Sequence, residues 1–257
     1  MDMTTGRRGI IWKTPDITAD GLKMFACITM LIQTVGIAVI EKRLIHLDGY
    51  TQESLNQAMA QDSRLMTLAG IGSIMQLVGG MAIPVFVFLL VEGFRNTSDY
   101  KKYLLLMLVT ALVSEIPYDF AMSGKLWDFS GQNGMISMCI CLVMLKGLDL
   151  FKDAAGFAGG VVKALLVLAA VVWVSLLRAE YGLCLVLLTA VFYIFYTKNV
   201  LKTVLGGLIS LMYVTGPISF YGIWCYNGVR KDRINKYAFY IFYPLHLLVL
   251  GILAKYL

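Results

Sequence analysis

Hydrophobic residues in this chain are gathered into long runs, and the polar residues between the runs form short connecting segments. Each run is continuous, without the alternation of apolar and polar positions that is typical of an outer-membrane barrel strand. A helix over residues 22–40 reaches about 28 Å, which matches a hydrocarbon core of about 30 Å. The pattern predicts an all-α, polytopic transmembrane helix bundle of about 8 spans, over residues 22–40, 65–94, 103–116, 134–150, 157–177, 181–196, 201–225 and 236–257.

Two of these runs carry residues that interrupt a helix. The run at 65–94 is longer than one straight crossing needs and contains Gly79, Gly80 and Pro84. It predicts a broken second span, the alternative being a surface entry helix followed by a short span. The run at 201–225 contains Gly216-Pro217, where the chain either continues across the membrane or makes a re-entrant turn.

The connecting segments predict an orientation. Residues 1–21 lack the apolar core of a signal peptide and are expected to form a cytoplasmic tail. Residues 41–64 form a polar outer loop, in which 51–61 could be a short surface helix. Eight crossings put both termini on one side of the membrane. If that side is the cytoplasm, the inner segments hold eleven Lys and Arg residues and the outer segments nine, which is the bias that the positive-inside rule predicts. The final loop does not follow this rule, because its four basic residues would lie on the outer side: Arg230, Lys231, Arg233 and Lys236. They would lie on the inner side if the preceding run turned back.

The composition supports a membrane protein and limits its partners. The chain is 59% hydrophobic and 15% charged, with a mean hydropathy of +0.75, values outside the range of water-soluble domains. Its net charge of +6 comes from short clusters beside apolar runs, so we expect membrane lipid rather than nucleic acid as the partner. The five cysteines lie within apolar runs without a C-x-x-C spacing, and no metal site is predicted.

The last run contains the most distinctive ionisable side chain. His246 lies about 15 Å into the predicted helix, next to Tyr243 and Pro244. An unpaired imidazole at this depth is costly, so the ring is expected to face the bundle interior. Either it is hydrogen-bonded as part of the packing, or it serves as a catalytic base. The second histidine, His46, lies in the polar loop and is expected to be solvated or interfacial.

A second group of candidates surrounds the end of the third run. Glu115 and Asp119 are four residues apart and could share a helix face, although Pro117 between them is expected to end the helix. Asn133 belongs to the same predicted outer side. Two carboxylates near a buried histidine could orient its ring and stabilise the imidazolium form. The alternative is solvation of a helix end.

Basic residues mark the opposite, inner surface. Arg95, Lys101 and Lys102 follow the second run, where they could hold the phosphates of a donor that approaches from the cytoplasm. The alternative is an ordinary positive-inside anchor. No Gly-rich loop of the Walker type is present, so nucleotide hydrolysis is not predicted.

Several stretches, in this order along the chain, resemble the TraX family of membrane proteins: LKMFACITMLIQTVG, IPVFVFLLVEGF, KKYLLLMLVTALVSEIPYD, GQNGMIS, YNG and KYAFYIFYPLHLL. The resemblance extends over nearly the whole chain, so residues 1–257 are expected to form a single TraX-like domain. It implies a bacterial inner-membrane acyltransferase that takes an acetyl group from acetyl-CoA. The family member that gives the name acetylates the N-terminus of pilin; the acceptor here, an amine or a hydroxyl, is open.

If the chain has this activity, the candidate residues are His246, Glu115, Asp119, Asn133 and Tyr243 for catalysis and Arg95, Lys101 and Lys102 for acetyl-CoA. This chain also departs from the family pattern. The first span has Gln33-Thr34 where the family carries an Asp-His pair. Further along the chain, Gly80 stands where a basic residue is common, and Asn96 where a histidine is common. The alternative to an enzyme is therefore a non-catalytic membrane partner or a small-solute carrier.

Overall fold

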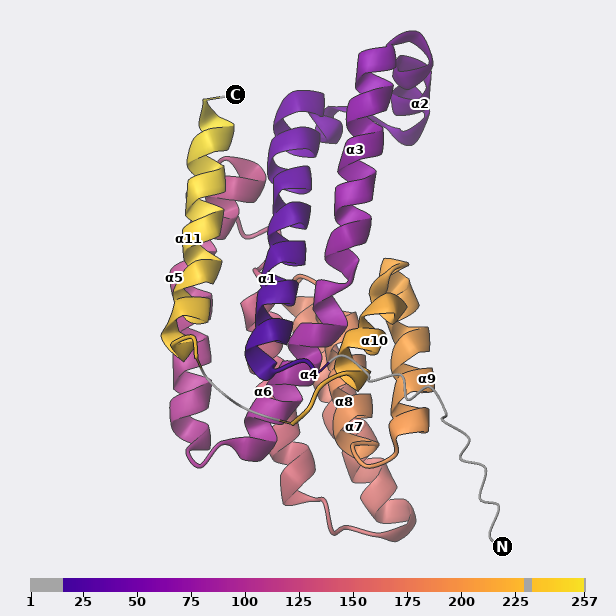
Figure 1. The fold of residues 1–257 in the computed structure, drawn as a ribbon, viewed down its shortest axis with the longest axis vertical. Helices are drawn as coiled ribbons and strands as arrows, with labels where there is room; N and C mark the ends of the chain where they lie inside the picture. Colours follow the sequence, from indigo (N-terminus) through magenta and orange to yellow (C-terminus); the bar gives the residue numbers. More distant parts are fainter. Residues whose placement is uncertain (1–15, 229–232, 257) are drawn as a thin grey trace, which may run out of the picture.

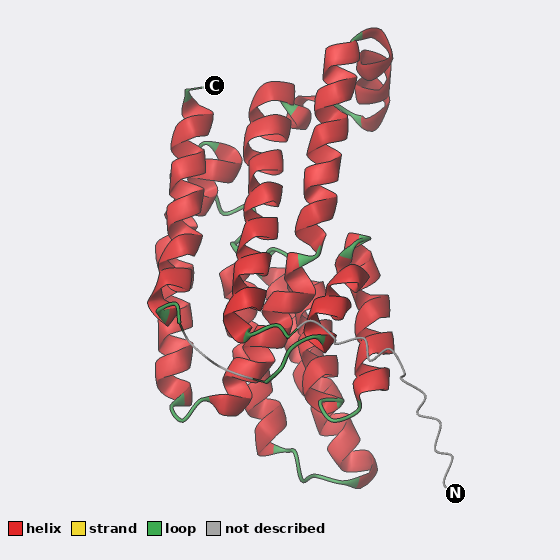
Figure 2. Ribbon diagram, viewed as in Figure 1, coloured by secondary structure: helices red, strands yellow, loops and turns green. Residues whose placement is uncertain are grey.

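The computed structural model describes residues 16–228 and 233–256, and within these ranges the chain is helical with no β-strand (Figures 1 and 2). The elements in chain order are α1 (Ala19–Val35), the π-helix η1 (Gly36–Ile45), η2 (Leu47–Gly49), α2 (Gln52–Gln61), α3 (Ser63–Gly80), α4 (Ala82–Asn96), α5 (Tyr100–Ser123), α6 (Gly134–Leu150), α7 (Gly156–Leu176), α8 (Gly182–Ile194), α9 (Asn199–Ser210), η3 (Leu211–Tyr213), η4 (Gly216–Ile218), α10 (Ser219–Trp224) and α11 (Lys236–Lys255). Arg7, Arg8, Lys13, Arg230 and Lys231, which entered the predicted charge count, lie outside the described residues.

The predicted membrane character is confirmed, but the predicted number of spans is not. Among the described residues, five helical stretches are long and apolar enough to cross a membrane: Ala19–Ile45, Ser63–Asn96, Tyr100–Ser123, Gly156–Leu176 and Lys236–Lys255. Shorter apolar helices cover Gly182–Ile194 and Asn199–Tyr213. The chain is an all-helical, multi-pass membrane protein, and several of its apolar runs form helices shorter than a full crossing.

The helices are arranged unevenly along the long axis of the molecule (Figure 1). Helices α6 to α10 gather around α4 at the end where α1 begins, whereas α3, α5, α11 and the π-helical continuation of α1 extend to the other end. The core of the crowded half is aromatic, because Phe192 meets Phe88 and Phe220 edge to face at centroid distances of 6.3 and 5.7 Å. The predicted surface helix is confirmed as α2, which has no buried residue.

The second span is broken as predicted, between α3 and α4 at Met81. A Cβ on Gly79 would overlap the Gln33 side chain, and a Cβ on Gly80 would lie 2.6 Å from the Tyr213 carbonyl oxygen. Both glycines are thus required by close approach of other segments. Pro84 lies in the first turn of α4, where a proline has no intrahelical hydrogen bond to lose.

Gly79→Ala is expected to lower the free energy of unfolding by about 1–3 kcal/mol, because the new methyl group must displace the Gln33 side chain. The matched control is Gly70→Ala in the same helix, where an added Cβ would meet no atom within 4 Å. There the substitution is expected to raise the free energy of unfolding by about 1 kcal/mol, because alanine has a higher helix propensity than glycine. Thermal unfolding of the two detergent-purified variants checks this, and equal midpoints would contradict the tight contact.

The prediction that Pro117 ends its helix is wrong. Helix α5 continues through Pro117 to Ser123 and ends at Gly124 in the left-handed conformation, with φ 74°. Helix α11 packs along α5, and Gly251 allows close contact, since a Cβ there would lie 2.5 Å from Phe120. A proline is tolerated inside a membrane helix when neighbouring helices pack around the kink, and Pro117 is buried.

The chain turns back within the run at 201–225. Helix α9 ends at Ser210, Val214 has φ 45°, and η4 and α10 return toward the end where α9 began (Figure 1). Gly216 packs against Ser210, whose carbonyl oxygen would lie 2.5 Å from an added Cβ. The chain thus follows the course of the re-entrant alternative, and the start of α1 and the end of α11 lie at opposite ends of the molecule, not on one side as eight crossings predicted (Figure 1). Helices α1 and α11 start at the same end of the molecule and run parallel (Figure 1).

This turn also changes the position of the two described basic residues of the final loop, Arg233 and Lys236, in the charge distribution. The end at which α1 begins carries eleven of the described Lys and Arg residues, and the opposite helix ends carry six. The larger group is Lys23, Arg95, Lys101, Lys102, Lys146, Lys152, Lys163, Lys198, Lys202, Arg233 and Lys236, and the smaller is Lys42, Arg43, Arg64, Lys125, Arg178 and Lys255. The positive-inside rule predicts that the first group faces the cytoplasm.

Candidate active site

A cavity of about 680 Å³ lies between α1, α4, α5 and α11 and reaches the start of α6. At one end it is lined by Lys23, Lys102 and Lys236, each within the first five residues of its helix. At the other end it is lined by His246 and Glu180. Lys236 and His246 are ten residues apart on α11, so these two ends are separated by about 15 Å. We call them the mouth and the inner end.

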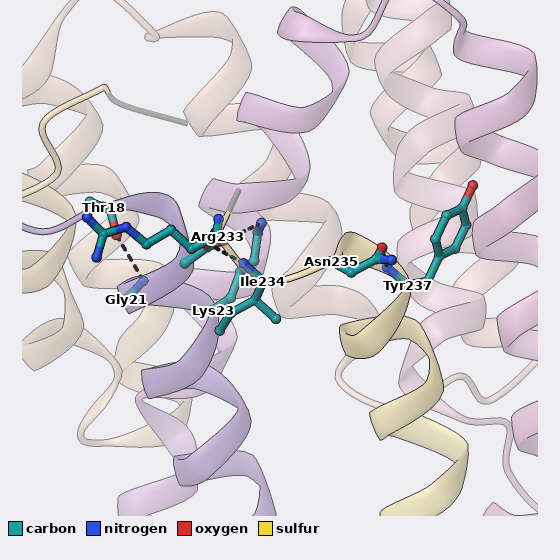
Figure 3. Close-up of polar contacts among 8 residues, drawn as sticks. Thr18, Gly21, Lys23, Arg233, Ile234, Asn235 and Tyr237 are labelled. Atoms are coloured by element: carbon teal, nitrogen blue, oxygen red, sulfur yellow. Dashed lines mark hydrogen bonds and ion pairs between the residues drawn. The ribbon is translucent and has the colours of Figure 1, made fainter. Parts of the chain in front are cut away.

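The mouth is held together by Asp20 in the first turn of α1. Its Oδ1 pairs with Lys23 Nζ at 3.1 Å, and its Oδ2 accepts hydrogen bonds from the backbone N–H groups of Arg233 and Ile234 at 2.8 and 3.2 Å. Figure 3 shows Arg233 and Ile234 beside Lys23, just before the start of α11. Asn235 then caps α11 by accepting from the Tyr237 N–H at 3.1 Å. These contacts fix the start of α11 against the start of α1.

His246 lies in the wall of the inner end and is buried. Its Nδ1 is 2.9 Å from the Phe242 carbonyl oxygen. Because a carbonyl only accepts, Nδ1 carries the proton and the neutral ring keeps a lone pair on Nε2. Nε2 has no hydrogen-bond partner among the described residues. The ring stacks on Phe242 and meets Tyr243 edge to face at a centroid distance of 5.6 Å, so its orientation is set by aromatic packing.

Glu115 and Asn133 are brought together, but not with His246. The Asn133 side-chain amide donates to a Glu115 carboxylate oxygen and, at 2.9 Å, to the Ala111 carbonyl. Asn133 also caps α6, because its Oδ1 accepts from the Met135 N–H at 3.0 Å. The pair therefore fastens the start of α6 to α5.

Asp119 holds the same connecting segment at a second point. Its Oδ2 accepts from the Asp128 N–H at 2.9 Å. Within the described part of the chain, neither Asp119 nor Glu115 forms the expected contact with His246, whose Nδ1 already donates within its own helix. The physical reason is that α5 continues past Pro117 and directs both carboxylates to the 124–133 segment.

The three predicted donor-binding residues are separated by the structure. Both Lys101 and Lys102 are exposed, but Lys102 lines the cavity and Lys101 does not. Arg95 lies over the ring of Tyr196, with its guanidinium carbon 3.8 Å from the centroid. The Tyr196 hydroxyl in turn donates to Glu92 Oε1 at 2.7 Å. Arg95 therefore belongs to a packing cluster between α4 and the chain after α8.

Sequence reasoning missed Glu180 and Tyr181, which line the inner end. They lie between α7 and α8, outside the five long apolar stretches. Burial raises the pKa of Glu180 to about 7. Burial also raises the pKa of Tyr181 well above its ordinary value, so its hydroxyl stays protonated. The sequence signal that could have found Glu180 is its position as a single carboxylate in the short segment between the apolar runs 157–177 and 181–196.

Comparison with protein families identifies the chain. The family profile described as TraX protein matches residues 18–254, from the cap of α1 to the last turn of α11. The chain belongs to the TraX family. All residues that line the cavity lie within the matched range. Neither the curated proteins nor the solved structures contain a significant match.

Three of the four positions at which this TraX chain is expected to depart from the family pattern lie together in space. Gln33 and Thr34 on α1 and Asn96 at the end of α4 all line the cavity. Gly80 does not line it; it packs against Tyr213 and Thr215. His46 is exposed at the end of η1, as expected. His246 is thus the histidine of the cavity among the described residues.

Proposed function

We propose that this protein is a membrane-embedded acyltransferase of the bacterial inner membrane that moves an acetyl group from acetyl-CoA to an amine or hydroxyl acceptor. The observation that carries the proposal is a single cavity joining a mouth of three lysines to an inner end with a buried imidazole. The first feature suits the phosphates of a donor. The second suits proton removal from a nucleophile.

The shape of the cavity supports acetyl-CoA as the donor. Between the mouth and the inner end, its walls are mainly apolar, with Met30, Leu89 and Met138 among the lining residues. This apolar section suits the pantetheine arm of the donor. Ammonium groups at the mouth favour phosphate oxygens, so the nucleotide is held near Lys102 while the thioester reaches the inner end.

At the inner end, His246 serves as the base in this proposal. Its Nε2 lone pair takes the proton of the acceptor nitrogen or oxygen as that atom attacks the acetyl carbonyl carbon. Tyr243, packed against the ring, supplies a hydroxyl that can donate to the developing oxyanion. Glu115, Asp119 and Asn133 act indirectly, by fixing the segment that leads to α6 at this end of the cavity.

A second candidate function is a carrier for small solutes or a non-catalytic partner. It is favoured by the uncharged side chains of Gln33, Thr34 and Asn96 at cavity positions where the family carries ionisable residues. A carrier would produce solute flux in sealed vesicles without any acyl donor. An acyltransferase would release free thiol only when donor and acceptor are both present.

The proposal is tested by incubating detergent-purified protein with acetyl-CoA and either a primary amine or an alcohol, and measuring release of the CoA thiol. We expect release above the rate without protein, together with acetylated acceptor in equal amount. The paired change Gln33→Asp with Thr34→His then asks whether a first-span base adds to the activity. Protein that is folded yet releases no thiol with any acceptor would contradict the proposal.

A further inference from the structure

The inner end of the cavity contains a second ionisable group besides His246. Glu180 lines the cavity from the turn between α7 and α8, and its Oε2 lies 3.8 Å from where a Cβ on Gly134 would be. We propose that Glu180 is a catalytic acid of this site, which gives its proton to the sulfur of the departing thiol. This inference rests on the acyltransferase function proposed above.

The backbone of Glu180 is held in place on both sides. Its N–H donates to the Gln132 carbonyl at 2.9 Å, and its carbonyl accepts from the Ser137 hydroxyl at 2.8 Å. In the opposite direction, the Gln132 N–H donates to the Arg178 carbonyl at 3.2 Å. These bonds hold the turn against the start of α6. The backbone that carries the Glu180 carboxyl is therefore fixed in position, as a catalytic group requires.

Tyr181 adds a sign of functional constraint. It has φ 56°, in the left-handed region that non-glycine residues seldom adopt. Such conformations persist when the surroundings enforce them, and they are enriched at functional sites. The ring of Tyr181 packs edge to face on Tyr213 at a centroid distance of 5.3 Å. The conformation places both Glu180 and Tyr181 in the cavity wall.

The groups that face Glu180 are phenols. Tyr181 interacts with the carboxyl from the neighbouring position, Tyr118 from α5, Tyr243 from α11 and Tyr213 from η3. Burial disfavours the carboxylate and outweighs the hydrogen bond from the Tyr181 hydroxyl, which favours it, so the pKa of Glu180 is raised to about 7. A carboxyl that is partly protonated at neutral pH can act as a general acid.

The proposed step balances protons and electron pairs. The acceptor atom forms a bond to the acetyl carbonyl carbon, and its proton passes to Nε2 of His246. When the carbon–sulfur bond breaks, the sulfur leaves with the electron pair and takes the proton of Glu180. The site then holds an imidazolium and a carboxylate, and transfer of one proton from His246 to Glu180 restores both groups. Tyr243 contacts the ring of His246 and interacts electrostatically with Glu180.

The test compares two small acetyl thioesters that lack the nucleotide, acetyl-pantetheine and the acetyl ester of 4-nitrothiophenol. A general acid matters for the alkyl thiol, whereas 4-nitrothiophenolate leaves without a proton. Glu180→Gln is therefore expected to lower the rate of acetyl transfer about 100-fold or more with acetyl-pantetheine. With the activated ester, the rate should fall less than about fivefold. His246→Ala is expected to lose activity with both donors, because the acceptor proton must still be removed.

Two controls separate this role from structural damage. Glu92→Gln removes another buried carboxylate that accepts from a tyrosine hydroxyl but does not line the cavity, and it is expected to retain wild-type rates with both esters. The pH profile is the second readout. With acetyl-pantetheine, the wild-type rate should fall as pH rises through about 7, where Glu180 loses its proton, and the Glu180→Gln profile should lack this limb.

Equal losses with the two thioesters in Glu180→Gln, or no loss with either, would overturn the role of Glu180 while leaving acyl transfer intact. Absence of transfer by the wild-type protein with both thioesters and with acetyl-CoA would instead overturn the proposed function. The two failures are therefore distinguishable in one set of assays.

Discussion

Replacing His246 with alanine is expected to lower acetyl transfer from acetyl-CoA by about 10²- to 10⁴-fold, the range found when a general base is removed. The affinity for acetyl-CoA should change little, because the phosphates are held at the mouth, about 15 Å along α11 from the ring. The measurement is thiol release at saturating donor, beside calorimetric binding. A parallel loss of binding and rate would indicate that His246 supports the cavity wall rather than the chemical step.

His46 offers the matched histidine control for this experiment. It is exposed at the end of η1, outside the cavity, and has φ 55°. Asparagine tolerates this left-handed conformation better than most residues, so His46→Asn removes the imidazole with little strain. Its activity should equal that of the wild-type protein. If both histidine variants lose activity alike, the assay reports general damage rather than catalysis.

Lys102→Ala is expected to weaken acetyl-CoA binding about tenfold, which corresponds to about 1.4 kcal/mol. The reason is the loss of an ammonium group from the mouth of the cavity, where a charge-assisted bond to phosphate is proposed. The neighbouring change Lys101→Ala should alter the affinity less than about twofold, because Lys101 does not line the cavity and its charge is screened by solvent and salt. Titration calorimetry at low and high salt measures both variants.

The contrast between these two lysines is the informative result, since they are adjacent in sequence and differ in position relative to the cavity. Equal effects of the two changes would place the donor on the open surface rather than in the cavity. Stronger weakening by Lys101→Ala would contradict the mouth as described. Lys102→Arg, which keeps the charge, should retain most of the affinity.

Much of the fold follows from local features of the chain. Helix-breaking glycines at 79 and 80 and the Gly216-Pro217 pair marked the places where the chain bends and turns back. In both places the glycines are required by tertiary contacts, with Gln33, Tyr213 and Ser210. Pro117 was misleading because its local effect is offset by packing against α11, which depends on residues more than 100 positions away.

The site was predictable only in part, for physical reasons. His246 was found because an imidazole within an apolar membrane helix costs free energy unless it faces the interior of the bundle. Glu180 was missed because a carboxylate in a short turn is normally solvated, and only the tertiary structure shows that α5, α6 and α11 close over it. The pairing of Glu115 with Asn133 likewise depends on where the 124–133 segment returns to α5.

The most direct test of the account is calorimetric titration of acetyl-CoA into detergent-purified, full-length protein. The central claim is that the cavity between α1, α4, α5 and α11 holds this donor with its phosphates at the lysine mouth. The account predicts saturable binding to one site per chain, weakened by salt because phosphate contacts contribute to it. Absence of binding to folded protein, or binding that is insensitive to both salt and Lys102→Ala, would contradict it.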